Sequence, residues 1–343
     1  MRKDILTPTA LFREALKKAW VSKGEILNDE IYDGEMHGLA TLVSSIYKGT
    51  RSSSWLFLEG KKNVTVLGQT NSRRLVVENG RAVGVDVIGP DGENLTVRAK
   101  YEVVVASGVY ESPKLLMLSG IGPREHLSSF GIETIIDSPH VGQNQLDHPI
   151  MPRVLKLKDS YGLDQHLLRS GPEKDGAVSS YRWKHKGPLS SGLLELIGLP
   201  RIDDRLKSCQ GYTEYLEENG GVDPFGPGGQ PHFEIDFVPM FCDAFQGNIP
   251  TPPQGDYFTV IGMKDIIESD YPWPMPRNSD EAMIKMILER SQTGFHPCGT
   301  TRMSQIVDAS VIPVIPDCRV HNAVYMIAEK TSDMIKAPYP ELY

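Results

Sequence analysis

The segment "EVVVASGVYESPKLLMLSGIG", residues 102–122, limits the fold of this chain more than any other stretch. The β-branched run Val103–Val105 predicts a buried strand that ends in a tight turn. Ser112 suits an N-cap, Pro113 suits the first position of a helix, and the apolar helical pattern stops at Gly120. Strand, turn and helix in this order form the half-unit with which α/β folds bring backbone close to a phosphate or a ring. We therefore expect an α/β fold.

The composition excludes several classes of protein. The chain has 343 residues, of which 40% are hydrophobic and 23% charged, and its formal net charge is −8. These values are typical of a soluble protein with one large or two medium domains, and they argue against a nucleic-acid partner or an anionic membrane surface. The apolar stretches are shorter than a membrane span and the N-terminus carries no secretory signal, so we expect a cytoplasmic location.

The cysteines and histidines predict neither a disulfide framework nor a metal site. The sequence contains no Cys-x-x-Cys and no His-Glu-x-x-His motif. The cysteines are scattered, at Cys209, Cys242, Cys298 and Cys318. Free, partly buried thiols of this kind are consistent with a reducing compartment, and we expect no metal.

The first half of the chain predicts a helix followed by a meander. Apolar residues recur at helical spacing over residues 9–22, which indicates an amphipathic helix. Residues 63–69 predict a strand, and residues 72–107 predict a meander. Asn-Gly and Asp-Gly dipeptides stand between its β-branched runs, where tight hairpins need positive φ angles.

The second half changes in texture at about residue 150. Residues 151–289 are rich in proline, glycine and polar residues, with alternating stretches such as "HFEIDFVPM", so we expect an antiparallel sheet with long loops. Residues 307–316 predict a strand and turn, and residues 322–337 predict a helix. Four residues of that helix are expected to face inward, namely Val324, Ile327, Ala328 and Ile335.

Two side chains in the C-terminal part are candidates for catalysis, each with a structural alternative. His296 lies in "FHPCGTTRM", where a proline and a Gly-Thr turn allow close approach to a flat group. Arg319 lies in "PDCRVHN" between apolar segments, which suggests an anionic partner. Most histidines are structural and most arginines are exposed, so both alternatives stay open. The absence of G-x-S-x-G makes a serine hydrolase a weak competitor.

Four ordered stretches resemble the glucose-methanol-choline (GMC) flavoprotein oxidoreductases. They are "ASGVYESPKLLMLSGIGP", "HVGQNQLDHP", "FHPCGTTRM" and "DASVIPVIP…VYMIAEKTSDMI". The resemblance implies a GMC-type FAD-binding domain with an antiparallel-sheet substrate domain, and catalytic roles for His296 and Arg319. It implies these cofactor-binding residues: Thr70, Ser107, Gly108, Asn144, Asp147, His148, Asp308, Ala309, His321 and Asn322.

The same resemblance suggests a domain plan and a substrate. A helical and loop segment is expected at 1–62, parts of the FAD-binding domain at 63–150 and 290–343, and the substrate domain at 151–289. Most of the family has Asn or His at the position of Arg319, eleven residues after Asp308, and arginine there resembles the fungal formate oxidase branch. This branch implies oxidation of a small, formate-like anion by hydride transfer to flavin N5, with O2 as acceptor.

The chain also departs from the family pattern. No strand with G-x-G-x-x-G is present, so the first βαβ unit of the FAD domain is missing, and the pattern shows internal gaps near residues 259–269 and 304–306. We therefore expect a version that is truncated at its N-terminus and internally deleted, with weak or no binding of FAD by this chain alone. The alternatives are a GMC enzyme for a neutral alcohol and a catalytically silent relic.

Overall fold

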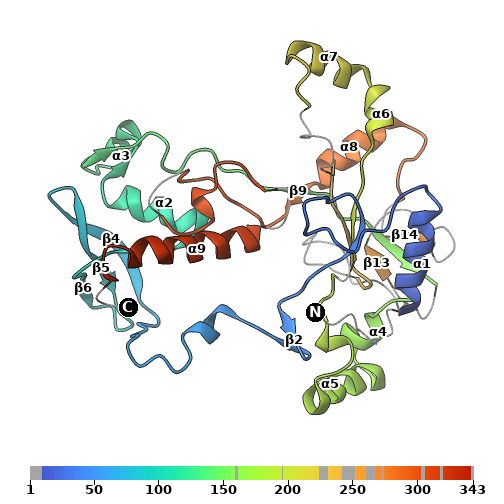
Figure 1. The fold of residues 1–343 in the computed structure, drawn as a ribbon, viewed down its shortest axis with the longest axis horizontal. Helices are drawn as coiled ribbons and strands as arrows, with labels where there is room; N and C mark the ends of the chain where they lie inside the picture. The colour runs from blue at the N-terminus through green and yellow to red at the C-terminus, as the bar shows by residue number, and fades with distance from the viewer. Residues whose placement is uncertain are drawn as a thin grey trace. The chain divides into compact units, whose positions relative to one another are not determined.

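The computed structural model divides the chain into two compact units (Figure 1). Unit 1 comprises residues 1–60 and 151–291, and unit 2 comprises residues 61–150 and 292–343. The chain therefore passes between the units three times. The structure describes residues 10–158, 161–194, 196–223, 231–241, 252, 254–255, 257–259, 267–271, 274–302, 306–316 and 320–340.

Two antiparallel sheets form the centre of unit 1. The first has the strand order β1 (Gly38–Thr41), β11 (Leu196–Leu199), β12 (Ile235–Phe237). The second has the order β13 (Tyr257–Thr259), β10 (Val154–Leu157), β14 (Ile267–Tyr271). Leu196–Leu199 is buried along its whole length, which explains its continuous apolar sequence. The antiparallel sheet expected within residues 151–289 is confirmed.

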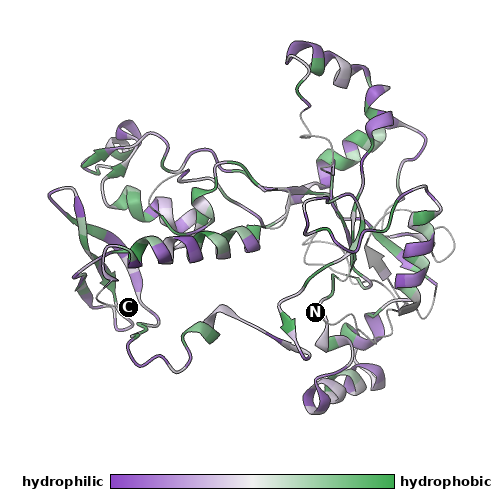
Figure 2. Ribbon diagram, viewed as in Figure 1, coloured by the Kyte–Doolittle hydropathy of each residue, from purple (hydrophilic) through white to green (hydrophobic). Residues whose placement is uncertain are grey.

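Helix α1 (Ala10–Val21) covers these strands and confirms the amphipathic helix expected at 9–22. Figure 2 shows both hydrophobic and hydrophilic residues along it. Phe12 and Leu16 are buried in one cluster with strand residues of both sheets. Trp20 meets Phe237 edge to face, with ring centroids 6.2 Å apart. A Cβ atom on Gly198 would come within 2.6 Å of the Trp20 ring, so this contact requires glycine at that position of β11.

The remaining elements of unit 1 are short helices and a hairpin. Asp164, fully buried at the start of α4, accepts hydrogen bonds from the backbone N–H groups of Phe241 (3.1 Å) and Tyr257 (2.8 Å). One carboxylate thus joins a helix to two later segments. The helices and hairpin strands of unit 1 besides α1 are β2 (Ile46–Tyr47), β3 (Thr50–Arg51), η1 (Ser54–Phe57), α4 (Asp164–Leu167), α5 (Pro172–Lys184), η2 (Pro188–Ser190), α6 (Asp203–Lys207), α7 (Gln210–Glu218) and α8 (Asp280–Arg290).

Unit 2 begins with the predicted meander. Strands β4 (Asn71–Glu78), β5 (Arg81–Ile88) and β6 (Asn94–Arg98) pair in that order and are antiparallel. Asn79 and Gly80 between β4 and β5 have φ angles of 52° and 75°, as a type I′ hairpin requires. The Asn-Gly signal therefore gives the right turn at the right place.

The rest of unit 2 packs helices against the meander and each other. Leu75 of β4 is buried with Leu115 and Leu116 of α2 and with Ile306. The elements are α2 (Gly108–Leu118), β7 (Ile121–Gly122), α3 (Arg124–Ser129), β8 (Ile136–Asp137), β9 (Pro149–Ile150), β15 (Gln292–Thr293), η4 (Ala309–Val311) and α9 (Val320–Lys336). β7 pairs with β8 in parallel, and β15 pairs with β9 antiparallel. Helix α9 confirms the predicted C-terminal helix.

Helix α2 differs from its prediction. It begins at Gly108, four residues before Ser112, so Pro113 lies inside the helix rather than at its first position. The N–H of Gly108 donates to the carboxylate of Asp308 at 3.0 Å. A group 200 residues away in the sequence thus satisfies the start of the helix, and the local capping signal at Ser112 is not used.

Three predicted strands are wrong. Val103–Val105 forms no strand. A β ladder needs a neighbouring strand, whereas here the Val105 carbonyl accepts a hydrogen bond from the N–H of Val307 at 2.9 Å. Residues 63–69 also form no strand, and their valines are exposed. In residues 307–316 the Asp308 side chain accepts the N–H of Ser310, which produces the short 3-10 helix η4 instead of a strand.

The inward face of α9 is only partly covered. Val324, Ile327 and Ile335 are half-buried, and Ala328 is exposed, which contradicts its predicted inward position. Near its start, α9 contacts η4 and the cluster around Val109. None of the helices in the described ranges is both long and apolar enough to cross a membrane.

Candidate functional site

The rings of His148 and His296 meet in unit 2, although 148 positions separate them in the sequence. Their Nδ1 atoms are 3.1 Å apart, and the ring planes are nearly perpendicular at 84°. Two imidazole nitrogens at this distance share one hydrogen, so one ring donates and the other accepts. Both rings are half-buried. The structure thus brings a predicted catalytic residue together with a predicted cofactor-binding residue.

The backbone around this pair is fixed by Asp147. Its Oδ1 accepts the N–H of His296 at 3.0 Å, and its Oδ2 accepts the hydroxyl of Thr293. The N–H of Gly294 donates to the carbonyl of His148 at 2.7 Å. A Cβ atom on Gly294 would lie 2.8 Å from that carbonyl, so the close approach of the two segments requires glycine. Asp147, expected to bind the cofactor, holds the backbone of His296 in the structure.

Phe295, just before His296, has a left-handed backbone conformation with φ of 59°. This conformation costs an ordinary residue about 1–2 kcal/mol. Its N–H donates to the Thr293 hydroxyl at 3.0 Å, while 63% of its surface is exposed. Local hydrogen bonds therefore maintain the strain, and burial of the ring does not. Such strain is typical of segments that aim a functional side chain.

A second cluster of polar groups surrounds Asp308, which is only 6% exposed. Its Oδ2 accepts the N–H of Gly108 at 3.0 Å and the hydroxyl of Ser112 at 2.5 Å. Its Oδ1 accepts the N–H of Ser310 at 2.8 Å. The Ser112 hydroxyl oxygen in turn accepts the N–H of Ser107 at 3.0 Å. The carboxylate therefore joins the start of α2 to η4.

Pro113 creates a further contact that the sequence did not reveal. A proline has no N–H, so the carbonyl of Val109, one turn earlier in α2, loses its helical donor. The hydroxyl of Thr300 donates to that carbonyl at 2.6 Å. The next residue, Thr301, makes a 2.5 Å bond with the hydroxyl of buried Ser310. The Gly-Thr-Thr turn after His296 is thus anchored to α2 and η4.

The other predicted cofactor residues differ in exposure and contacts. Ser107 and Asn144 are exposed, as are His321 and Asn322 in the first turn of α9. The Thr70 hydroxyl donates to the Gly68 carbonyl at 3.1 Å. Ala309, in η4, is half-buried, and its carbonyl accepts the N–H of Gly299 at 3.2 Å. Arg319 lies outside the described residues.

Cys298, two residues after His296, has a fully buried thiol. Burial raises the pKa of this thiol, while nearby Arg302 opposes the rise and Asp147 adds to it. The backbone of Cys298 forms a reciprocal bridge with Leu146. A protonated, inaccessible thiol of this kind is a packing residue. Cys209 is free and exposed, and Cys242 and Cys318 lie outside the described residues.

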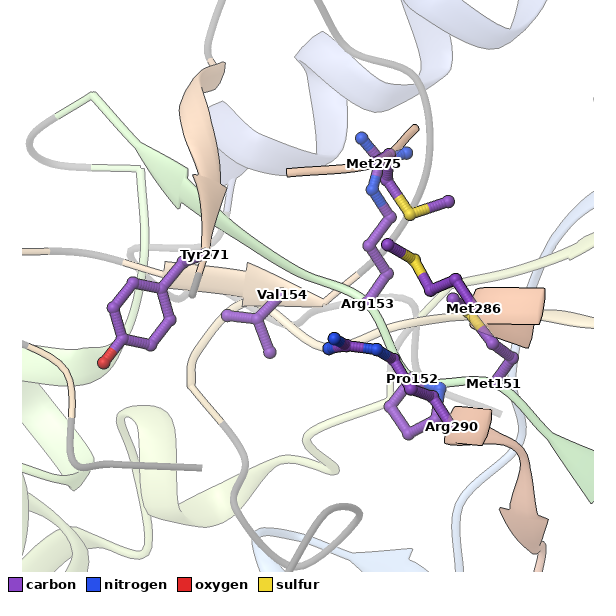
Figure 3. Close-up of a pocket in the computed structure, with 8 residues that line it drawn as sticks. All are labelled: Met151, Pro152, Arg153, Val154, Tyr271, Met275, Met286 and Arg290. Carbon is purple, nitrogen blue, oxygen red and sulfur yellow. The ribbon is translucent and has the colours of Figure 1, made fainter. Parts of the chain in front are cut away.

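A small pocket in unit 1 has a different character (Figure 3). In this view its methionines lie on one side and Tyr271 on the other. Burial would raise the pKa of nearby Asp270, but hydrogen bonds from Arg277 and Arg153 lower it to about 2. The volume of the pocket is about 20 Å³, little more than one water molecule occupies. The lining residues are Met151, Pro152, Arg153, Val154, Tyr271, Met275, Met286 and Arg290.

Comparison with known proteins identifies the family. The profile of the family named GMC oxidoreductase matches residues 10–150. A solved variant of the formate oxidase of Aspergillus oryzae is 42% identical, with a TM-score of 0.95 over 99% of this chain and 72% of that chain. The chain belongs to the GMC oxidoreductase family and has its fold, with mixed helices and antiparallel sheets. GMC oxidoreductases, formate oxidase among them, are FAD-binding flavoproteins.

Curated relatives extend the comparison. An uncharacterized GMC-type oxidoreductase of Mycobacterium tuberculosis is 29% identical over 81% of this chain. An oxygen-dependent choline dehydrogenase of Pseudomonas putida is 26% identical over 98% of this chain and 69% of its own length. The chain spans 60% of the length of the mycobacterial relative.

Two features of unit 2 leave room and a free polar atom for a bound group. Gly108 has a positive φ of 83°, and a Cβ atom there would meet nothing within 4 Å, so the start of α2 presents open space beside exposed Ser107. The buried Nε of Arg302 has no hydrogen-bond partner among the described residues, and its Nη2 lies 3.4 Å from the Asn144 carbonyl. For the pyrophosphate, the described residues contain no glycine-rich strand, turn and helix.

A metal centre has no support in the geometry. The described residues contain no group of three or more His, Cys, Asp or Glu side chains placed to hold a metal ion.

Proposed function

We propose that this protein is an FAD-dependent oxidoreductase that removes a hydride from a small anionic substrate of the formate class. The observation that carries the proposal is the 42% identity with formate oxidase over 99% of this chain. Arg319 in the sequence supports it, because most of the family has Asn or His at that position. Unit 2 is proposed as the FAD-binding part and unit 1 as the substrate domain.

Formate needs a cation more than it needs a base. It has no hydroxyl proton, and loss of hydride from its carbon gives carbon dioxide directly. The guanidinium of Arg319 offers two parallel N–H donors that match the carboxylate, and it stays charged at every physiological pH. FAD, when bound, would supply the hydride acceptor, with O2 as final electron acceptor. The balance is one formate, one proton and one O2 to one carbon dioxide and one hydrogen peroxide.

His296 is proposed to orient the substrate, and Arg319 to bind its charge. Its ring is anchored through His148, and its backbone through Asp147. With formate, the protonated ring would hold one carboxylate oxygen through its Nε2–H. With a neutral alcohol, an unprotonated ring nitrogen would accept the hydroxyl proton. The same side chain therefore serves either substrate class, and Arg319 distinguishes them. The free thiols of Cys209 and Cys298 favour a reducing compartment such as the cytoplasm.

A neutral alcohol is the second candidate substrate. The similarity to oxygen-dependent choline dehydrogenase, which extends over 98% of this chain, favours it. A chain that does not hold FAD is the third possibility. It is favoured by the lack of strand structure at Val103–Val105 and by the lack of a pyrophosphate cradle among the described residues.

Two measurements test the proposed function. Purified protein is first reconstituted with FAD and examined for bound flavin by its absorbance. Bound flavin is then mixed anaerobically with formate or with methanol, and its bleaching is followed in a single turnover. Formate is expected to reduce it faster, and Arg319→Lys to recover part of what Arg319→Asn loses. Protein without bound flavin supports the silent form, and faster reduction by methanol supports the alcohol oxidase.

A further inference from the structure

The contact between His148 and His296 restricts how His296 can carry its hydrogens. Only one hydrogen fits between the two Nδ1 atoms, 3.1 Å apart. If His296 donates it, the Nε2 of the neutral His296 ring carries a lone pair. If His148 donates it, that Nε2 carries a hydrogen. The partner ring therefore decides the chemical character of the nitrogen on the other side of His296.

Both rings are held by rigid local structure. The strand pair β9 and β15 aligns Pro149–Ile150 with Gln292–Thr293, immediately beside the two histidines. The Gly294 N–H to His148 carbonyl bond and the His296 N–H to Asp147 bond continue this alignment. These bonds hold in register the two backbone segments that carry the rings. The histidine pair is thus a built feature of unit 2, with the local precision that positioning requires.

We propose that His148 is a positioning residue that accepts the Nδ1 hydrogen of His296 and so presents Nε2 of His296 to the substrate. The proposal rests on the proposed function, which places His296 beside the substrate. A proton taken up at Nε2 makes the His296 ring cationic, and its bond to His148 then becomes charge-assisted and shorter. His148 therefore holds one orientation of His296 in both its neutral and its charged form.

The acceptor beside His296 is the imidazole of His148 rather than a carboxylate, which suits a site whose proposed substrate is an anion. A carboxylate placed against His296 would orient the ring equally well, but its charge would repel formate at close range. The structure has a carboxylate next in the sequence, Asp147, and directs it to the backbone N–H of His296 and to the Thr293 hydroxyl. The ring of His296 meets an uncharged acceptor instead. The arrangement matches a small carboxylate better than it matches a cation.

The tautomers of the two rings test the proposal without flavin. Protein labelled with 15N-histidine is measured by two-bond 1H–15N correlation NMR, and the signals are assigned with His148→Gln and His296→Gln. We expect His296 to carry its hydrogen on Nδ1 and His148 to present a lone pair at Nδ1. A hydrogen on His148 Nδ1 with none on His296 Nδ1, or rings that exchange freely between tautomers, would overturn the proposal.

Rescue by a conservative variant gives a second, kinetic test on reconstituted protein. His148→Phe removes the acceptor and is expected to slow anaerobic flavin reduction about 10–100-fold, as loss of an orienting partner typically does. His148→Gln supplies an amide oxygen as acceptor and is expected to retain most of the rate. His140→Phe, an exposed histidine of the same loop, is the matched control.

Each failure has its own signature. Equal loss of rate in His148→Phe and His148→Gln means a role in packing alone and refutes the positioning role. If formate and methanol both fail to reduce flavin bound to the wild-type protein, the proposed function fails, and the tautomer measurement alone judges the histidine bond. If His148→Phe does not fold, the wild-type tautomers still decide the proposal.

Discussion

Replacing Asp308 by alanine is expected to destabilise unit 2 by about 3–5 kcal/mol. The carboxylate accepts three hydrogen bonds, from Gly108, Ser112 and Ser310. A hydrogen bond to a charged group contributes about 1.5–3 kcal/mol, and the desolvation of the carboxylate offsets part of the sum. Ser112 is 0% exposed, so water cannot replace the lost acceptor. Asp308→Asn keeps an acceptor oxygen but loses the charge, so it is expected to destabilise unit 2 by about half as much as Asp308→Ala does.

The tryptophans provide an internal control for this experiment. Their sequence positions, 20, 55, 183 and 273, all fall within the residue ranges of unit 1. Urea unfolding is followed by tryptophan fluorescence for unit 1 and by hydrogen exchange of the α2 amides for unit 2. Only the second signal is expected to move toward lower urea.

Asp137→Asn is the matched control, since Asp137 is half exposed and its ion pair with Arg124 Nε, 3.2 Å, contributes at most about 1 kcal/mol. If Asp308→Ala weakens α2 no more than Asp137→Asn does, the carboxylate is not the tie between the turn and η4.

Three further predictions follow from the sites described above. Arg319→Asn should slow flavin reduction by formate far more than by methanol, because only the anion uses the two parallel N–H donors of the guanidinium. Equal slowing with both substrates in stopped-flow absorbance would assign Arg319 a structural role. The pKa of Asp270 is lowered to about 2, so its ionised form stabilises unit 1 above about pH 4, and this contribution is lost as the pH falls toward 2. Arg153→Met should therefore move acid unfolding, followed by tryptophan fluorescence, to higher pH. An unchanged midpoint would contradict a stabilising role for the bonds of Arg153 and Arg277 to Asp270. Iodoacetamide should modify exposed Cys209 quickly and buried Cys298 only in urea, as peptide mass spectrometry can check; rapid labelling of Cys298 in the native protein would show that its burial is wrong.

The sequence predicts those elements whose signal is local. Helix α1 follows from apolar spacing within one helix, and the β4–β5 hairpin follows from Asn79-Gly80 between two β-branched runs. Helix α9 follows in the same way. In each of these cases the residues that specify the structure are also the residues that form it.

Elements that depend on distant partners were not predictable. Val103–Val105 has the β propensity of a strand, but propensity does not supply a neighbour for its backbone. The start of α2 is determined by Asp308, 200 residues further along the chain. The motif around His296 could be found, but its bond to His148 could not, because no local pattern encodes which ring faces which.

The order of the two units along the chain has a consequence for synthesis on the ribosome. Unit 2 is encoded in two pieces, and all of residues 151–291 are made between them. At a rate of 5–20 residues per second, that stretch takes about 7–30 s to translate. During this time α2 has emerged without Asp308 for its first turn, without Thr300 for its proline gap and without Ile306 for its apolar face. The nascent chain therefore exposes the core of unit 2 long enough for a chaperone to recognise it.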